Sequence, residues 1–414
     1  MKKRDYDVIV VGCGPGGAAA GNFAALNGMK TLVVEQKREI GVPITDLIAV
    51  IYSVGEIEEA AGLKIDRSWI NTLIAGVRYF SASGKSGETR LWPDGISIRR
   101  SAFDRGSAEN AIRNGAEIWV DTRFVDLIKD KNGAVTGVKV LRGGRPMELS
   151  CSVVIGADGT YANVARLAGI PLPGDALVGF GHTLVAVYPD QPLLPPTYEV
   201  HTVPEIAPGH FAWVVPMAKG KYVVGIDYCP TMLKEDVTCR QLWWRFVKHL
   251  EDIGRYKFDK AGMLDMCCGG TILFHEAPKK IVGDGVMLIG DAAWRPLFRT
   301  EYGAGGQHHA IRTGRWAAEV AAQAIKDGDV SEKSLSRYPQ RCIDSLKGME
   351  GAIETGRELY YKYVGMSPEM REKAIVEIGQ HIGGLHLLMR GSSRAMDVIQ
   401  PVTEWFKKEN MWQK

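Results

Sequence analysis

The stretch Val8-Ile-Val-Val-Gly12-Cys-Gly14-Pro-Gly-Gly17 decides the fold of this chain. Its apolar run is short enough for a buried strand and leads directly into a glycine-rich turn. In such a turn Gly12 permits the tight reversal, Gly14 lets a pyrophosphate approach the backbone, and Gly17 lets the next helix pack closely on the strand. The turn residues expected to surround a pyrophosphate are Gly12, Cys13, Gly14, Pro15 and Gly17.

A helix and a second strand follow the turn. The Ala- and Gly-rich run that ends near Leu26 is expected to point its N-terminal N–H groups and its positive dipole end at the phosphates. The apolar run Thr31-Leu-Val-Val then ends at Glu35, about 20 residues further on, where a carboxylate accepts a hydrogen bond from a ribose 2′-OH. An acid there, next to Gln36, argues against the 2′-phosphate of NADP and favours FAD or NAD.

Size and composition limit the classes of function. With 414 residues, 45% of them apolar and 24% charged, the chain is expected to be globular with two or three domains. A net charge of +3 and the lack of a Lys/Arg run argue against nucleic-acid binding. Seven cysteines without a C-x-x-C pair argue against structural zinc and against a secreted disulfide framework. We expect no bound metal.

The cellular location is predicted from hydropathy. No apolar window approaches about 18 uninterrupted residues, which is the minimum for a membrane-spanning helix. We therefore expect a cytoplasmic protein, and peripheral contact with a membrane stays open.

Two further segments place a carboxylate or glycine turn directly after a short apolar run. One is Val153-Val-Ile-Gly156-Ala-Asp158-Gly159. The other is Val286-Met-Leu-Ile-Gly290-Asp291, which leads through an irregular loop to Gly303-Ala-Gly305-Gly306. Open α/β sheets bind ligands beyond the carboxyl ends of their strands. Three such ends on one ligand imply a cofactor longer than a mononucleotide.

The fold class expected is α/β, a Rossmann-like nucleotide-binding domain interrupted by an antiparallel β-sheet substrate domain and followed by a C-terminal helical region. Apolar and polar residues alternate between turns over residues 76–100 and 177–230, which predicts antiparallel strands. Helical periodicity begins after about residue 330. The expected boundaries are 1–75, 98–175 and 282–330 for the nucleotide-binding domain, 76–97 and 176–281 for the sheet domain, and 331–414 for the helical region.

The three motifs together resemble the FAD-binding set of the p-hydroxybenzoate-hydroxylase-like flavoproteins. The resemblance implies that FAD is the cofactor and that the glycine turn holds its pyrophosphate. It also implies roles for the other motif residues: Glu35 on the adenosine ribose, Asp158 and Gly159 in support of the flavin domain, Asp291 after Gly290 on the ribityl chain, and Gly303, Gly305 and Gly306 at the helix N-terminus near the isoalloxazine.

Within that group the chain is similar to the geranylgeranyl reductase-like branch. Arg100-Ser-Ala-Phe103-Asp104 and the later Gly115-Ala-Glu117 match a motif of the branch. This implies that Arg100 lies near the cofactor and that Phe124 touches adenine. Phe211-Ala-Trp213-Val-Val-Pro216 is similar to a Trp-x-Phe-Pro hairpin beside the substrate channel. The implied activity is reduction of carbon–carbon double bonds in an isoprenoid (geranylgeranyl-type) lipid, with hydride from flavin N5.

The chain departs from this branch in the loop after Asp291. A bulky Trp294 follows Asp291, and the loop to Tyr302 is longer than the usual pattern. The residues expected to line the substrate site are Trp213, Pro216, Trp294 and Tyr302. Glu301 and Asp46 are weighed as proton donors, and no catalytic residue is assigned.

Two other activities stay open on the same fold. One is a flavin-dependent monooxygenase or halogenase that acts on an aromatic substrate. The other is an electron carrier of the electron-transfer flavoprotein–quinone type, which commonly adds clustered cysteines for an iron–sulfur centre. A reductase also needs an external electron donor, either NAD(P)H or a ferredoxin-like protein, and the sequence favours neither.

Overall fold

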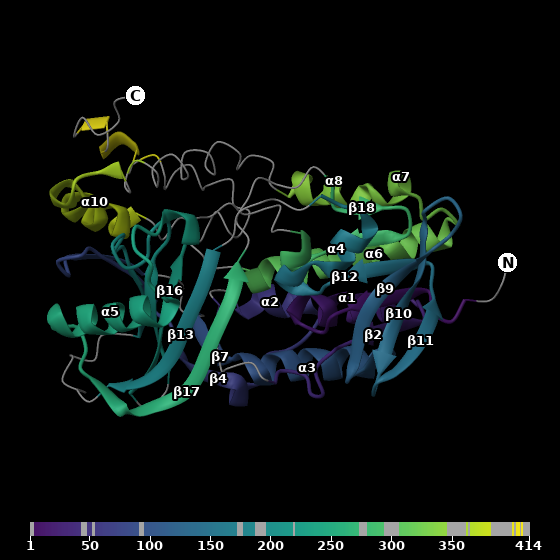
Figure 1. Ribbon diagram of the computed structural model, residues 1–414, viewed down its shortest axis with the longest axis horizontal. Helices are drawn as coiled ribbons and strands as arrows, with labels where there is room; N and C mark the ends of the chain where they lie inside the picture. The colour runs from purple at the N-terminus through teal and green to yellow at the C-terminus, as the bar shows by residue number, and fades with distance from the viewer. Residues whose placement is uncertain are drawn as a thin grey trace.

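The computed structural model describes residues 4–42, 48–51, 54–90, 95–171, 177–186, 196–217, 220–272, 280–293, 306–345, 362, 365–381, 400, 403–405 and 407–408. Figure 1 shows two regions, with the N-terminal strands and helices at one end and long antiparallel strands at the other. Helix α3 (Arg100–Arg113) extends along one side of the N-terminal region.

The nucleotide-binding region is built on a six-stranded sheet. Its strands, in spatial order, are β18 (Val282–Gly283), β19 (Val286–Leu288), β12 (Val153–Gly156), β1 (Val8–Val11), β2 (Thr31–Val34) and β8 (Glu117–Trp119). All neighbours are parallel except β18 with β19. The apolar runs around β1, β2 and β12 are almost fully buried. The Rossmann-like fold class predicted from the sequence is therefore confirmed.

Two helices cross at close range over this sheet. They are α1 (Pro15–Leu26) and α6 (Gly306–Lys326). A Cβ atom on Gly314 of α6 would lie 2.3 Å from the carbonyl oxygen of Gly16 in α1. Only glycine permits this approach, which places the first turn of α1 against the third turn of α6.

The second region is a seven-stranded sheet. Its strands, in spatial order, are β17 (Phe258–Ile272), β13 (Leu177–Ala186), β16 (Lys221–Tyr228), β15 (Ala212–Pro216), β14 (Thr197–His201), β5 (Gly76–Phe80) and β6 (Ser86–Arg90). Helix α5 (Cys239–Asp252) covers one face through Trp243 and Phe246. The pairs are antiparallel as expected, except that β14 and β5 are parallel. No hairpin joins those two strands, because the middle of the chain separates them, so no turn enforces the antiparallel direction.

Two smaller sheets complete the strands. The strands β9 (Thr122–Lys129), β10 (Val135–Arg142) and β11 (Arg145–Ser150) form an antiparallel meander that the sequence analysis did not separate from the nucleotide-binding region. The strands β3 (Ile48–Ile51), β7 (Ile96–Arg99) and β4 (Ile70–Leu73) form the other. Within the described residues, α2 (Val54–Ala61) and α4 (Asn163–Ala168) are the remaining α-helices before α5. Because β7 runs directly into α3, the small sheet fixes where α3 begins.

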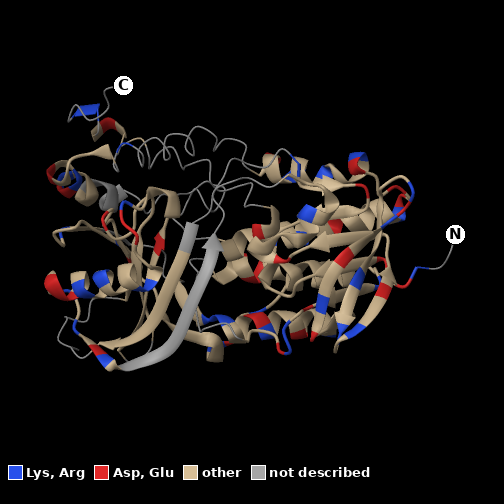
Figure 2. Cartoon of the chain, viewed as in Figure 1, with Lys and Arg blue, Asp and Glu red and all other residues tan. Residues whose placement is uncertain are grey.

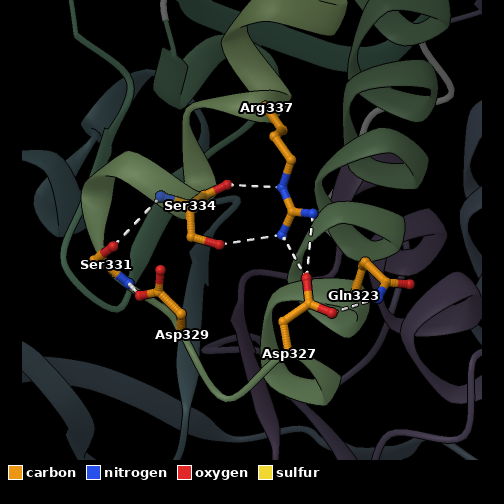
Figure 3. Close-up of polar contacts among 6 residues, drawn as sticks. All are labelled: Gln323, Asp327, Asp329, Ser331, Ser334 and Arg337. Carbon is orange, nitrogen blue, oxygen red and sulfur yellow. Dashed lines mark hydrogen bonds and ion pairs between the residues drawn. The ribbon is translucent and has the colours of Figure 1, made fainter.

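The segment after α6 folds back against it (Figure 3). Helices α7 (Glu332–Leu335) and α8 (Arg337–Asp344) follow a turn in which Asp329 accepts a hydrogen bond from the Ser331 N–H at 3.0 Å. The guanidinium of Arg337 donates to Asp327 at 3.3 Å from each Nη, and to the carbonyl and hydroxyl oxygens of Ser334. The first part of the predicted C-terminal helical region is thereby tied to α6.

Helix α10 (Pro368–His381) contacts the other sheet instead. Its Glu372 carboxylate accepts hydrogen bonds from the Ser81 hydroxyl at 2.7 Å and the Ser83 N–H at 2.9 Å, both in the turn between β5 and β6. The described helices after residue 330 thus contact both sheets. The division into three domains at the predicted boundaries stays a prediction.

Charged residues of both signs alternate along α3, α5 and the β9–β11 sheet in the view of Figure 2. This distribution agrees with the small net charge of +3. Among the described residues, no helix is both long enough and apolar enough to cross a membrane.

Candidate cofactor and substrate site

The three sequence motifs meet at one edge of the six-stranded sheet. They follow β1, β12 and β19, which are adjacent and parallel, so their carboxyl ends point the same way. Backbone hydrogen bonds continue this pairing past the strands, from Ala157 N to Val11 O at 2.8 Å and from Ile289 N to Gly156 O at 3.0 Å. The structure therefore brings together the motif residues that it describes.

The glycine turn has one open position between two crowded ones. Gly12 has φ of +101°, and a Cβ there would lie 2.4 Å from the Ala157 carbonyl oxygen. A Cβ on Gly17 would lie 1.9 Å from the Gly12 oxygen, whereas one on Gly14 would meet no atom within 4 Å. Gly14 is also the N-cap of α1 and offers no side-chain cap to its N–H groups. The space beside Gly14 and the uncapped helix end fit a pyrophosphate.

The Glu35 carboxylate stabilises the glycine turn through a backbone hydrogen bond. Its buried carboxylate accepts hydrogen bonds from Cys13 N and Lys37 N, each at 2.9 Å. A carboxylate has lone pairs for further donors, so these contacts leave room for a ribose hydroxyl, and Gln36 is exposed beside it. Burial raises the pKa of the Cys13 thiol, which therefore stays protonated.

Phe124 lies near the same rim. The N–H of Thr122, at the start of β9, donates to the Glu35 carbonyl oxygen at 2.8 Å. Phe124 follows on this strand, is partly buried and packs against the core of the nucleotide-binding region. That Phe124 touches adenine, and that Glu35 binds ribose, stay predictions.

Asp158 has one oxygen that the described residues do not use. Its Oδ2 accepts from Val164 N at 3.1 Å, at the start of α4. Its Oδ1 is buried without a hydrogen-bond partner among the described residues, and burial raises the pKa of this carboxyl group. Gly159 follows with φ of +66° and open space beside its Cα. An unpaired buried oxygen next to open space fits a ligand that brings a donor.

The third motif is anchored to α6. Gly290 has φ of +56° and donates its N–H to the Thr313 hydroxyl at 3.2 Å, which in turn donates to the His309 carbonyl at 2.8 Å. Asp291 lies in the single 3₁₀ turn Gly290–Ala293, which packs against the turn at Gly159. Gly306 is the first residue of α6.

Arg100 joins two helices at this edge. It is the first residue of α3, and its Nε donates to Asp104 Oδ1 at 2.8 Å. With the Gln307 amide oxygen facing the guanidinium, that oxygen accepts hydrogen bonds from Nε at 3.0 Å and Nη1 at 2.7 Å. The sequence analysis assigned no function to Asp104 or Gln307. The i,i+4 spacing of Arg100 and Asp104 is a signal that predicts their contact, whereas no local pattern connects Gln307 to Arg100.

Trp213 lies across the face of the seven-stranded sheet that α5 does not cover. It pairs with Gly225, where a Cβ would come within 2.1 Å of Trp213 Cζ2. A Cβ on Gly181, one strand further, would lie 3.3 Å from Trp213 Cη2. The indole therefore lies flat against the backbone at Gly225 and Gly181. The buried Val215 and Val223 lie beside it on the same face.

A hydrogen bond connects this apolar face to the cofactor edge. The buried Ser97 hydroxyl, on β7, donates to the Pro216 carbonyl oxygen at 3.1 Å. Ser97 is close in sequence to Arg100, where α3 begins. The strand thus fixes the position of the Trp213–Pro216 segment relative to Arg100.

Several predicted residues lie outside the described part of the chain. They are Asp46, Trp294, Glu301, Tyr302, Gly303 and Gly305. Within the described residues, no group of three or more His, Cys, Asp or Glu side chains has the arrangement of a metal site.

Comparison with protein families identifies the cofactor. Residues 7–176 match the FAD-dependent oxidoreductase family, and residues 100–297 match an FAD-binding domain. The chain is an FAD-dependent oxidoreductase, and the open space at Gly14 and the unpaired Asp158 oxygen fit this cofactor.

Individual proteins are similar over most of the chain. A digeranylgeranylglycerophospholipid reductase of Methanothrix thermoacetophila is 32% identical over 82% of this chain and 83% of its own length. The crystal structure of a geranylgeranyl bacteriochlorophyll reductase-like protein from Thermoplasma acidophilum has a TM-score of 0.80, 25% identity, and coverage of 97% of this chain and 98% of that one. A flavin-dependent brominase shares the fold with a TM-score of 0.72 at 18% identity, over 98% of this chain and 99% of its own.

Proposed function

Because the chain belongs to the digeranylgeranylglycerophospholipid reductase family, we propose that it hydrogenates carbon–carbon double bonds in the isoprenoid chains of a lipid. The structural observation that carries the proposal is the apolar face at Trp213, which β7 connects to the edge where Arg100 lies. When bound and reduced by an external donor, FAD would supply a hydride from its N5 atom to such a double bond, and an acid or water would supply the proton that completes the addition of H₂.

The chain's own residues would orient the two reactants. The glycine turn and Glu35 would hold the nucleotide end of the cofactor, and Asp291 and the start of α6 would hold its flavin end. The partly exposed indole of Trp213 would offer an uncharged surface for an isoprenoid chain, and the buried Val215 and Val223 keep the surroundings of the indole apolar. Such a surface also keeps water from the reacting carbon atoms.

Product analysis tests the proposed function directly. The FAD-loaded protein is reduced anaerobically with dithionite and mixed with a digeranylgeranyl glycerophospholipid in detergent. We expect the lipid to gain one H₂ per saturated double bond in the mass spectrum. An unchanged lipid across several geranylgeranyl lipids contradicts the proposal, and an oxygenated or halogenated aromatic product under air supports the alternative activity.

The substrate surface is tested with a matched pair of tryptophan variants. Trp213→Ala removes the flat indole and is expected to lower kcat/KM for the lipid about tenfold to a hundredfold, mainly through KM, because buried apolar contact is lost. Trp244→Ala removes an indole from α5, which packs on the opposite face of the same sheet, and should leave KM unchanged. Equal effects of both variants on KM would place the lipid elsewhere.

The proposed reduction needs an external electron donor, either NAD(P)H or a ferredoxin-like protein. Reduction by NADH, NADPH or a ferredoxin-like protein is followed by anaerobic bleaching of the flavin absorbance. The donor that bleaches it fastest supplies the electrons. Flotation with lipid vesicles, with and without the substrate lipid, tests whether the protein binds the membrane surface while it reaches its substrate.

A further inference from the structure

The Arg100 guanidinium is held from two directions by side chains of two different helices. Asp104, on the same helix, accepts from Nε at 2.8 Å. Gln307, in the first turn of α6, accepts from Nε and Nη1 when its amide oxygen faces the guanidinium, the orientation in which its donors and acceptors match their neighbours. The Asp104 side chain is 1% exposed and that of Arg100 is 21% exposed. Two fixed acceptors and little solvent leave the guanidinium one position, beside the N-terminus of α6.

Charged groups of both signs surround the pair formed by Arg100 and Asp104. Burial raises the pKa of Asp104, and the charges of Arg100 and Lys37 oppose that rise, while Glu35 adds to it. The N-terminus of α6 contributes the positive end of its dipole. The ion pair with Arg100 Nε, at 2.8 Å, favours the ionised form of Asp104 against the cost of burial. The Asp104 carboxylate therefore opposes the charge of the arginine, whereas Gln307 binds the same guanidinium without adding a charge.

Such charges act on a flavin through its reduction. Two-electron reduction of FAD adds negative charge, which nearby positive groups stabilise and nearby negative groups oppose. The effect is larger at buried positions, because water screens it less. The extent to which Arg100 stabilises reduced FAD therefore depends on the charge of its two hydrogen-bond acceptors, Asp104 and Gln307.

We propose that Asp104 and Gln307 are positioning residues for Arg100, and that together they set the reduction potential of the bound FAD. The two hydrogen bonds fix the guanidinium beside the first turn of α6, and the Asp104 carboxylate offsets part of its positive charge. This inference rests on FAD as the cofactor and is independent of the lipid substrate.

Two isosteric variants test the proposal in opposite directions. Asp104→Asn keeps an oxygen for Arg100 Nε and removes the negative charge, so the midpoint potential of bound FAD should rise. Gln307→Glu keeps the acceptor and adds a negative charge, so the potential should fall. We expect each variant to change the relative affinity for reduced and oxidised FAD at least tenfold, which is about 30 mV for a two-electron couple. The double variant should return close to the wild-type value.

The measurement is dye-coupled anaerobic reduction of the full FAD-loaded chain, with FAD binding and thermal unfolding of the apoprotein measured in parallel. Glu109→Gln is the control, because it removes a carboxylate from the same helix at a side chain that is 67% exposed. Unchanged potentials in both variants, or shifts of the same sign, overturn the proposal. If Asp104→Asn does not retain FAD, the sign of the Gln307→Glu shift decides.

The outcome is separable from that of the lipid assay. A wild-type protein that reduces no lipid, but whose variants shift the potential as stated, contradicts the proposed function and supports this inference. If the wild-type protein reduces the lipid and neither variant changes the reduction potential, the result supports the proposed function and contradicts this inference.

Discussion

A methyl group added at Gly14 and one added at Gly17 meet opposite surroundings in the same turn. The Gly14 position faces open space, and its φ of −76° suits any residue. At Gly17 the added atom would overlap the Gly12 carbonyl oxygen at 1.9 Å. One glycine therefore serves the ligand and the other serves the packing of helix on strand.

Gly14→Ala and Gly17→Ala should separate cofactor binding from stability. We expect Gly14→Ala to unfold at the wild-type temperature as apoprotein but to bind FAD at least about tenfold more weakly, because its methyl group enters the pyrophosphate space. Gly17→Ala should lose about 1–3 kcal/mol of unfolding free energy through overpacking. Calorimetry of the apoproteins and fluorescence titration with FAD provide both readouts. A Gly14→Ala protein with normal affinity would place the pyrophosphate elsewhere.

At the residue scale, the sequence predicted the positions that belong to local motifs and missed contacts between distant segments. The glycine turn, Glu35 and the two later Gly/Asp motifs were expected at strand ends, and the structure has Glu35, Asp158 and Asp291 there. Gln307 was missed because its contact with Arg100 joins two helices that are distant in sequence. The Ser97–Pro216 bond was missed for the same reason. A serine in a strand gives no sign of which distant carbonyl it will reach.

At the scale of elements, helical periodicity predicted that a helix such as α10 forms but not which part of the molecule it contacts. The sequence predicted a helical region after about residue 330, and the structure has α10 there at Pro368–His381. Its docking against the turn between β5 and β6 had no signal in the sequence, because a glutamate and two serines are common surface residues. The parallel pairing of β14 with β5 was likewise hidden, since strand direction is a property of connections and not of strand composition.

The contacts of Glu372 are expected to hold α10 in place. Glu372→Ala removes hydrogen bonds to Ser81 and Ser83, worth about 1.5–3 kcal/mol for a charged acceptor. Amide hydrogens of Pro368–His381 should then exchange at least about tenfold faster, while those of α1 keep their rates. Glu369→Ala, at an exposed position of the same helix, is the control. Equal exchange in both variants would show that the apolar contacts of α10 suffice.

At the scale of the whole molecule, a buried ionic cluster in the seven-stranded sheet predicts how stability changes with pH. Glu199 accepts hydrogen bonds from Arg255 Nε at 3.0 Å and the Tyr256 hydroxyl at 2.7 Å, and it lies 3.3 Å from His201 Nε2. Burial alone would raise the pKa of Glu199, but the His201 hydrogen bond and the Arg255 charge outweigh it and lower the pKa to about 2. A folded-state pKa below the ordinary 4.5 means that the stabilisation is complete above that pH and is lost as the pH falls toward 2.

Acid unfolding of a Glu199→Gln variant checks this assignment. We expect its unfolding temperature to be lower than that of the wild type at neutral pH, because Arg255 loses its charged partner. Below pH 4.5 its unfolding temperature should fall less steeply, because no carboxylate takes up a proton there. Asp236→Asn, at an exposed position before α5, serves as the reference. A wild-type slope in the Glu199→Gln protein would assign the acid sensitivity to other groups.

The strand order of the six-stranded sheet also has a consequence for synthesis on the ribosome. Strand β1 leaves the ribosome first, but its neighbour β12 comes from the middle of the chain and the next strand, β19, ends only at Leu288. At translation rates of about 5–20 residues per second, the first strand waits on the order of tens of seconds for the last of these strands. During that interval β1, β2 and β8 lack the two strands β12 and β19 that complete their side of the sheet, so the nascent chain is expected to need chaperones.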